Sequence, residues 1–388
     1  MFKWITAGES HGEALVMVME GVPAGFEIDG DLISAQLRRR QGGHGRGARQ
    51  QIERDGVHIL SGVRNARTLG SPVAMTIRNK DWENWQGRMG PQRFEEEPEK
   101  ITRLRPGHAD MAGALKYNHD DVRNVLERAS ARETAARVAV GGFCRLCLAE
   151  FGVEVHSLTR RIGPIESDAQ PPYDWDAVEA SPVRALSGGD EMVQAIDDAR
   201  DAGDTLGGVY EVVAEGVPVG LGSYVHWDRK LDGLLGQAIM SIQAHKGVTV
   251  GPGWENAQLP GSKVHDVIEP DASGRLSHRT NRAGGIEGGV SNGEPIVVQA
   301  AVKPISTLLK PLESTDLKTR QKVEAHYERS DVCVVPAAGV VGEAMVAIVL
   351  WTEFLEKFGG DSLSEIRRNY ESYLESTKPG AEVAGARS

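Results

Sequence analysis

The sequence contains few cysteines. Its 388 residues include only three, of which Cys144 and Cys147 form the one closely spaced pair. A structural zinc site usually needs four ligands, and the sequence has no second pair to complete one. The pair also lies in an alanine- and valine-rich helical stretch rather than at a strand-to-helix turn, where redox-active pairs lie. We therefore expect no metal and no redox role for these cysteines.

Signals for a membrane or for export are also missing. No run reaches the roughly 18 apolar residues that a membrane span needs. The chain passes from Met1 to the polar segment at residues 8–11 at once, which leaves no room for the apolar stretch and cleavage site of a signal peptide. We expect a cytoplasmic protein with no membrane partner.

Positive charge is in deficit, since 44 basic and 55 acidic residues give a net charge of −11. A globally acidic protein is a poor nucleic-acid binder by charge alone, so a local basic cluster stands out. Residues 38–49 (RRRQGGHGRGAR) hold five arginines, His44 and four glycines, with no acid before Glu53. Glycine lets the backbone offer N–H groups to an anion, and arginine pairs with phosphate and carboxylate. No aromatic residue is interleaved, so the pattern favours a small polyanion; a solvated loop is the alternative.

Two histidines lie on glycine-containing turns. His11 stands in the segment GESHG at residues 8–12, and His108 stands in RLRPGHAD at residues 103–110. Histidine exchanges protons near neutral pH, so both are candidates for acid–base chemistry. Asp110 could orient the ring of His108 or cap the following helix, and capping is the simpler prediction.

Further segments could contact anions. Arg128 and Arg132 are four residues apart, which predicts that they share one helical face. The segment at residues 281–289 is rich in glycine, and Lys303 to Thr307 end a predicted strand. Neither has the spacing of a dinucleotide-binding or a Walker loop. A basic and an acidic residue precede an apolar run at residues 329–333.

The chain contains an internal similarity. Residues 6–25 align without a gap to residues 201–220, at an offset of 195, with nine of 20 positions identical. Each segment reads as a glycine-rich turn, a strand and a Gly-Val-Pro-x-Gly turn, which predicts a duplicated framework. The second copy has Leu206 where the first has His11, so we expect the chemistry in one copy only.

Periodicity and turn residues predict the remaining elements. We expect helices at 30–40 (opened by Asp29 or Asp31), at 109–149 (one or two, packed centrally because of their alanines), within 171–204, at 230–245 and at 339–358. We expect strands within 57–80 and at 153–165, 295–305 and 332–336, and long loops at 81–107 and 247–295.

Taken together and in this order, these motifs resemble those of the chorismate synthase family. The resemblance runs from Gly8 to Asp361, about nine-tenths of the chain, and the segments at 105–108 and 128–134 are particularly specific to that family. It implies an α+β fold: a single-domain β-α-β sandwich with a helical layer between two antiparallel sheets. We expect this domain at residues 1–375 and a disordered tail at 376–388. A homotetramer is also implied.

The resemblance implies a reaction: the anti-1,4-elimination of phosphate and a ring proton from 5-enolpyruvylshikimate 3-phosphate, giving chorismate. FMN is required in its reduced form, although the overall reaction is redox-neutral. NADPH would act only indirectly, through an external flavin reductase. Substrate and cofactor are both anionic, which explains the arginine clusters.

Residue roles follow from the same resemblance. His11 would protonate the leaving phosphate, and His108 would lie beside the flavin and tune its charge. Asp331, with Ser10 or Ser130, would assist proton movement around N5 of the flavin. The anionic groups of the substrate would be bound by Arg40, Arg46, Arg49, Arg105 and Arg132. Flavin contacts would come from Arg128, Ala129, Ser130, Gln243, Ala244, Gly288, Lys303, Pro304, Ile305, Ser306, Thr307 and Arg329, and Arg40 and Arg46 also match positions assigned to NADP in the family.

Three positions depart from the family pattern. Ser330 stands where many relatives have histidine, Gln243 where others have asparagine, and His245 where an aliphatic residue is usual. Two other functions stay open on the residues alone. One is a flavin reductase turned over by NADPH, although the chain has no added nicotinamide-binding domain. The other is RNA or polyanion binding through residues 38–54, which salt-sensitive binding would reveal.

Overall fold

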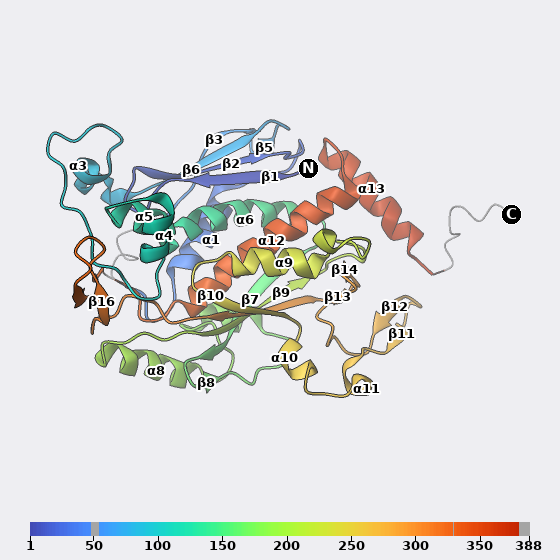
Figure 1. The fold of residues 1–388 in the computed structure, drawn as a ribbon. Coiled ribbons are helices and arrows are strands. Elements are labelled where there is room, and N and C mark those ends of the chain that lie inside the picture. The colour runs from blue at the N-terminus through green and yellow to red at the C-terminus, as the bar shows by residue number, and fades with distance from the viewer. Residues whose placement is uncertain (48–53, 329, 380–388) are drawn as a thin grey trace.

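The protein is an α+β sandwich in which helices fill the space between two antiparallel sheets (Figure 1). The computed structural model describes residues 1–47, 54–328 and 330–379. The first sheet has the strand order β1-β2-β6-β3, and the second has the order β10-β15-β9-β7-β8. One apolar cluster contains buried residues of both sheets and of the helical layer. This arrangement confirms the predicted fold class, and the single domain stays a prediction.

The elements have the following bounds. In the first sheet they are β1 (Lys3–Ala7), β2 (Ala14–Glu20), β3 (His58–Ser61) and β6 (Val73–Arg78), and in the second they are β7 (Glu154–Ile162), β8 (Ile165–Glu166), β9 (Gly208–Glu215), β10 (His245–Val250) and β15 (Ile296–Val302). The longer helices are α1 (Gly30–Gln41), α4 (Asp110–Tyr117), α5 (Arg123–Ala129), α6 (Thr134–Ala149), α7 (Trp175–Ala180), α8 (Gly189–Asp201), α9 (Leu231–Met240), α12 (Val335–Phe358) and α13 (Leu363–Ser376). Short pieces are β4 (Val63–Arg64), β5 (Arg67–Thr68), η1 (Lys80–Asn84), α3 (Gln86–Met89), η2 (Ala131–Glu133), η3 (Trp227–Arg229), α10 (Gly253–Asn256), α11 (Gly261–Val264), β11 (Ile268–Pro270), β12 (Leu276–His278), β13 (Ile286–Glu287), β14 (Val290–Ser291), β16 (Glu313–Thr315) and β17 (Lys322–Glu324).

Helix α12 is the centre of the layer. It is long and apolar enough to cross a membrane by composition, but 89% of its most apolar window is buried within the protein. A helix that is apolar on every side belongs in a core, and α12 packs against α6 and the second sheet. A Cβ atom on Gly141 of α6 would lie 2.3 Å from the Cβ atom of Ala344. Glycine is therefore required where these two helices meet, as expected from the small residues of this stretch.

The two similar segments adopt similar backbones. Strand β2 and the aligned residues 209–215 of β9 are both interior strands of their sheets. The turns that follow place Gly21 and Gly216 at φ of 75° and 73°, and Gly25 and Gly220 at 98° and 97°. Such angles strongly favour glycine. This agreement supports the duplication, which stays a prediction.

Strands β2 and β9 differ in their burial patterns. Alternate residues of β2 are buried, whereas five consecutive residues of β9 are buried. Helix α7 explains the difference, because its Val178 forms an apolar cluster with Val213 of β9 and Leu158 of β7 on the second face of that sheet. A strand that is covered on both faces loses the alternating pattern.

Some predicted elements were wrong or incomplete. The stretch at 109–149 is not one or two helices but α4, α5, η2 and α6, because Asn118 is left-handed and Ser130 is extended. The predicted strand at 332–336 is instead the start of α12, where Pro336 lies in the first helical turn, a position that favours proline. The predicted loop at 81–107 contains η1 and α3, and helix α9 ends at Met240, before His245 begins β10. Helix α13 extends to Ser376, and residues 380–388 of the predicted tail lie outside the described residues.

Candidate active site

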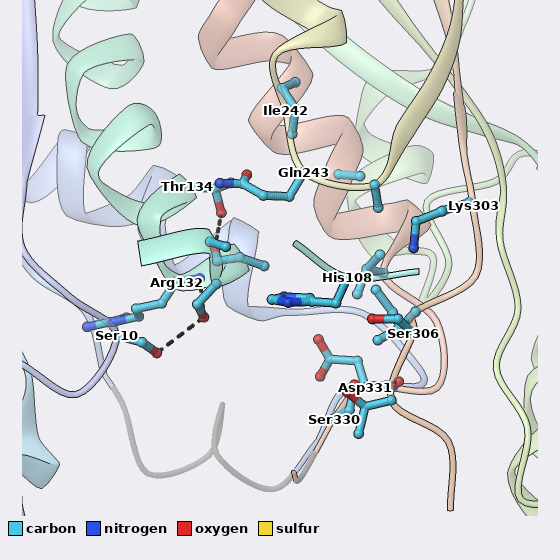
Figure 2. Close-up of a pocket in the computed structure, with 18 of the residues that line it drawn as sticks. Ser10, His108, Arg132, Thr134, Ile242, Gln243, Lys303, Ser306, Ser330 and Asp331 are labelled. Carbon is cyan, nitrogen blue, oxygen red and sulfur yellow. Dashed lines mark hydrogen bonds between the residues drawn. The ribbon is translucent and has the colours of Figure 1, made fainter. Parts of the chain in front are cut away.

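A cavity of about 830 Å³ opens at one end of the helical layer (Figure 2). Segments far apart in the sequence meet there: the turn after β1, the end of α1, the start of α4, the α5–η2 junction, the α9–β10 loop, the chain after β15 and the start of α12. Most of the predicted site residues line it, namely Ser10, His11, Arg40, Arg46, Arg105, His108, Ala129, Ser130, Arg132, Gln243, Ala244, Lys303, Ile305, Ser306, Thr307 and Asp331.

Three of the predicted residues that the structure describes do not line the cavity. Arg128 points to the first sheet and donates to the carbonyl oxygens of Gly8 and Thr6, at 2.9 and 3.0 Å. Pro304 is not among the lining residues, and Gly288 lies in the turn between β13 and β14. Arg49 and Arg329 lie outside the described residues.

The expectation that Arg128 and Arg132 share one helical face was wrong. Helix α5 ends at Ala129, and the extended Ser130 (ψ 143°) redirects the chain before η2 begins. Arg132 therefore turns to the cavity, where it donates to Asp55 at 2.6 Å and to Asn79. Arg128 and Arg132 therefore do not repel each other along one helix, and their spacing is no evidence for an anion bound between them.

Buried arginines form one wall of the cavity. Arg40 donates to Thr134 and to the carbonyl oxygen of Ala131, both at 2.8 Å, while its Nη1 lies 3.9 Å from Asp55. Burial, together with the charges of Arg46 and Arg132, lowers the pKa of Arg40 to about 9.

The arginine wall retains donors without acceptors. Within the described ranges, Nη1 of Arg40 and Nε of Arg46 have no hydrogen-bond partner, although both atoms are buried. The lining as a whole holds six arginine or lysine side chains and two carboxylates. Unpaired buried donors are costly, so a bound anion would stabilise this wall.

The cavity also has an apolar part. Its lining includes Met240, Ile242, Ala244 and Val341, and Lys303 is a further lining residue. Burial lowers the pKa of the Lys303 ammonium, and the neighbouring charge of Lys246 lowers it further. The cavity thus combines an apolar region with cationic groups, which suits a ligand that has a flat ring and anionic substituents.

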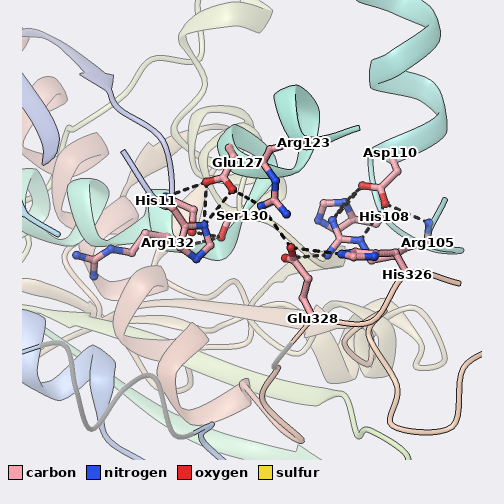
Figure 3. A network of polar contacts seen from close by, with 11 residues as sticks. His11, Arg105, His108, Asp110, Arg123, Glu127, Ser130, Arg132, His326 and Glu328 are labelled. Carbon is pink, nitrogen blue, oxygen red and sulfur yellow. Dashed lines mark hydrogen bonds and ion pairs between the residues drawn. The ribbon is translucent and has the colours of Figure 1, made fainter. Parts of the chain in front are cut away.

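Both predicted histidines lie at this cavity, and a buried carboxylate holds each of them (Figure 3). Nδ1 of His11 lies 3.0 Å from each carboxylate oxygen of Glu127. Nδ1 of His108 lies 2.5 Å from Oδ1 of Asp110 and 3.0 Å from Nη2 of Arg105. An ionised carboxylate only accepts, so Nδ1 of His108 donates to Asp110 and the contact with Arg105 is not a hydrogen bond.

Asp110 is not the helix cap that the sequence suggested. The N-cap of α4 is Ala109, and no side chain caps it. Asp110 is fully buried and also accepts from the backbone N–H and the guanidinium of Arg105. Burial acts to raise the pKa of this carboxyl group, but the hydrogen bonds from His108 and Arg105 outweigh it and hold the pKa well below its usual range.

Asp331 and two serines complete the polar lining. Asp331 accepts from the backbone N–H of Gly47 at 2.6 Å and pairs with Arg46 at 2.9 Å. Oγ of Ser130 donates to Oγ of Ser10 at 3.2 Å. Groups that are able to exchange protons therefore line the same cavity as the buried arginines.

Comparison with known proteins agrees with this geometry. The family profile described as chorismate synthase matches residues 2–355. Chorismate synthase of Geobacter metallireducens is 54% identical over 389 residues, covering 97% of this chain and 99% of that protein. The chain belongs to the chorismate synthase family. It is also 54% identical to the Desulforudis audaxviator chorismate synthase, over 97% of this chain and 98% of that one. A crystal structure of chorismate synthase superposes with a TM-score of 0.78 at 40% identity, covering 97% and 98% of the two chains.

Family membership makes the protein a carbon–oxygen lyase acting on phosphate. The structure adds several residues around the site that the sequence did not single out. His11 is contacted by Glu127 and Trp85, and Arg132 is contacted by Asp55 and Asn79. No regular spacing along the sequence connects these residues to the ones they contact. For Trp85 the sequence indicated only that it lies in the predicted loop at 81–107.

His245, which departs from the family pattern, lies at the apolar part of the cavity. It is 4% exposed, its Nδ1 donates to the carbonyl oxygen of Gln243 at 3.0 Å, and its Nε2 accepts from the hydroxyl of Tyr210 at 2.8 Å. Burial lowers the pKa of His245 from 6.5 to about 4. The ring is therefore neutral at pH 7, with its proton on Nδ1.

This buried neutral ring predicts a pH-dependent stability. The pKa of His245 is lower in the folded state than in the unfolded state. The contribution of the buried ring to the free energy of unfolding is therefore present in full above pH 6.5 and is lost as the pH falls to about 4. We expect a loss of up to about 3 kcal/mol over this window. Urea unfolding at several pH values measures it. The double variant Tyr210→Phe/His245→Leu should lose less stability over the same pH window. If the free energy of unfolding fell equally steeply with pH in both proteins, His245 would not be the group responsible.

Proposed function

We propose that the protein converts 5-enolpyruvylshikimate 3-phosphate into chorismate by anti-1,4-elimination of phosphate and a ring proton, using reduced FMN. This is the last common step of aromatic amino-acid biosynthesis. The observation that carries the proposal is the cavity itself, in which unpaired arginine donors, two carboxylate-bound histidines and an apolar region meet. Family membership supports the same reaction.

The residues present fit FMN. The flat ring system would lie against the apolar part, near Ile242, Ala244 and Val341, and its phosphate would be bound by Lys303, Ser306 and Thr307. The buried Oε1 of Gln243 has no hydrogen-bond partner within the described part of the chain and could accept from a ring N–H. When bound and reduced, FMN would supply electron density to the substrate as phosphate leaves and would recover it afterwards.

The side chains divide the remaining work. Arg40, Arg46, Arg105 and Arg132 would bind the phosphate and carboxylates of the substrate, with Arg49 as a further candidate outside the described residues. Charge that is fixed in advance and shielded from water stabilises the departing phosphate most effectively.

Proton transfer would fall to the remaining polar groups. His11 would donate the proton on Nε2 to the leaving phosphate, because its Nδ1 is bound to Glu127. Asp331, assisted by the hydrogen-bonded Ser10 and Ser130, would move the proton lost from the substrate ring. His108 would lie beside the cofactor and adjust its charge.

An anaerobic assay tests the proposal. Photoreduced FMN and 5-enolpyruvylshikimate 3-phosphate are supplied, and the absorbance of chorismate is followed, with oxidised FMN as the control. We expect product only with reduced FMN. Folded protein that forms no product would contradict the proposal, and NADPH consumption in air with FMN but no substrate would favour a flavin reductase.

The setting of the enzyme is part of the proposal. We expect a cytoplasmic homotetramer whose FMN is reduced by a separate NADPH-dependent reductase. Sedimentation of the purified protein measures the assembly state, and a monomer that retains full activity would contradict the tetramer.

A further inference from the structure

We propose that Glu127 is a positioning residue for His11, fixing its tautomer and its orientation so that Nε2 faces the cavity; this rests on the proposed role of His11 as the proton donor. Glu127 lies near the end of α5, is 2% exposed, and does not line the cavity itself. It therefore acts through the histidine and not on the substrate.

Contacts from Glu127 fix both the ring and the backbone of His11. Each carboxylate oxygen lies 3.0 Å from Nδ1, and Oε2 also accepts from the backbone N–H of His11 at 2.8 Å. The backbone carbonyl of Glu127 accepts from the N–H of Ser10 at 3.0 Å. These contacts join the turn after β1 to α5, although the two segments are 116 residues apart.

Trp85 restricts the ring from another side. Its ring stacks on His11 with a centroid distance of 3.9 Å and an interplanar angle of 26°. Trp85 is held in turn by a hydrogen bond of 2.8 Å from Nε1 to Asp81, and the guanidinium of Arg123 lies 5.1 Å from its ring centroid. Rotation of the imidazole would break both the stacking and the carboxylate contact, so its orientation is determined.

The charge of Glu127 fixes the tautomer. Burial acts to raise the pKa of this carboxyl group, but hydrogen bonds from His11 and Arg123 lower it below its ordinary value. An ionised carboxylate only accepts hydrogen bonds, so Nδ1 of His11 must carry a proton. Within the described residues Nε2 makes no hydrogen bond, and it is the nitrogen left to exchange a proton in the cavity.

This arrangement accounts for both ring protons of His11 during the proposed proton transfer. The imidazolium of His11 transfers the proton on Nε2 to an oxygen of the leaving phosphate, and the neutral ring keeps its remaining proton on Nδ1 towards Glu127. The carboxylate stays ionised throughout, as the carboxylate of a Ser-His-Asp triad does.

A chain of charged groups continues beyond this pair (Figure 3). Arg123 lies 2.9 Å from Glu127 and 3.6 Å from Glu328, and Glu328 lies 3.8 Å from Arg105. Arg105 contacts Asp110, which binds His108. Each histidine therefore has its own buried carboxylate, and the cations between the two pairs keep both carboxylates ionised.

Glu127→Gln tests the proposal with a side chain of almost unchanged shape. We expect kcat to fall about 10²-fold, within the range of acid–base contributions, with KM changed by less than about threefold. The variant His11→Ala/Glu127→Gln should have the same kcat as His11→Ala, because a residue that acts only through His11 adds nothing once the ring is absent. Glu211→Gln is the matched control. Glu211 is also a buried carboxylate, bound to Tyr173 and Gln299 outside the cavity, and its loss should leave kcat unchanged.

Nitrogen-15 NMR of histidine-labelled protein gives a readout that does not depend on turnover. The signals of His11 are identified by their loss in His11→Ala. In the wild type the neutral ring should carry its proton on Nδ1, and in Glu127→Gln a substantial share should carry it on Nε2.

Three results would overturn the proposal. They are a wild-type ring protonated on Nε2, unchanged kcat and tautomer in Glu127→Gln, and a further loss of kcat in the double variant. If the wild type forms no chorismate, the proposed function fails while the tautomer still tests the role of Glu127. If Glu127→Gln does not fold, the wild-type spectrum alone decides.

Discussion

His11→Ala is expected to lower kcat about 10²- to 10⁴-fold, and His108→Ala is expected to fall in the same range, because a positioned acid or base contributes that much to a rate. His11 lines the cavity and its Nδ1 is bound to Glu127, so the substitution removes the proton on Nε2 that the proposed reaction uses. The loss should appear in kcat and kcat/KM together, since the ring acts on the departing phosphate and contributes little to substrate binding. Anaerobic steady-state kinetics with reduced FMN measure both parameters.

His156→Ala is the matched control for this experiment. The ring of His156 stacks on Trp175 with centroids 4.6 Å apart, as that of His11 stacks on Trp85, but it lies on β7 and does not line the cavity. Its loss should leave kcat unchanged. Wild-type turnover in both His11→Ala and His108→Ala would show that the roles assigned to them are wrong.

Glu343→Ala is expected to destabilise the fold by about 3–5 kcal/mol, the cost of breaking a buried ion pair by removing one partner. Glu343 is fully buried in the middle of α12. Its carboxylate accepts from Arg39 at 2.6 and 2.9 Å, from Ser157 at 2.7 Å and from Arg184 at 3.2 Å, and it also pairs with Arg145.

The electrostatic setting explains the size of this effect. Burial acts to raise the pKa of Glu343, but three arginines around it hold the pKa well below its usual range. Without the carboxylate, cations from α1, α6 and the chain before α8 would face one another in a site of low dielectric constant. Because folded domains are stable by only about 5–15 kcal/mol, much of the stability would be lost.

Denaturant unfolding measures the change, with Glu356→Ala as the control. Glu356 lies on the same helix but is exposed, so its replacement should change the stability by no more than about 0.5 kcal/mol. A loss below about 1 kcal/mol for Glu343→Ala would mean that the arginines are solvated well enough without it.

The amino-acid sequence by itself determined the fold class and the family, and most of the site residues that it predicted do line the cavity. Helix α1 starts after Asp29, whose side chain accepts from the N–H of Asp31, because such capping depends only on neighbouring residues. The glycine turns, the arginine-rich segment and the histidine motifs are equally local, so they could be read and ordered along the chain. Asp29 and Asp31 could not be separated as the cap, since both suit that position.

Only the tertiary structure decided which side chains hold the catalytic candidates. The break at Ser130 turns Arg128 to the first sheet and Arg132 to the cavity, although regular helical spacing would keep them together. Glu127 reaches His11 across 116 residues, and Glu343 gathers arginines from several elements. Such contacts follow from the packing of elements against one another. They depend on the arrangement of the whole chain, and no spacing between neighbouring residues encodes them.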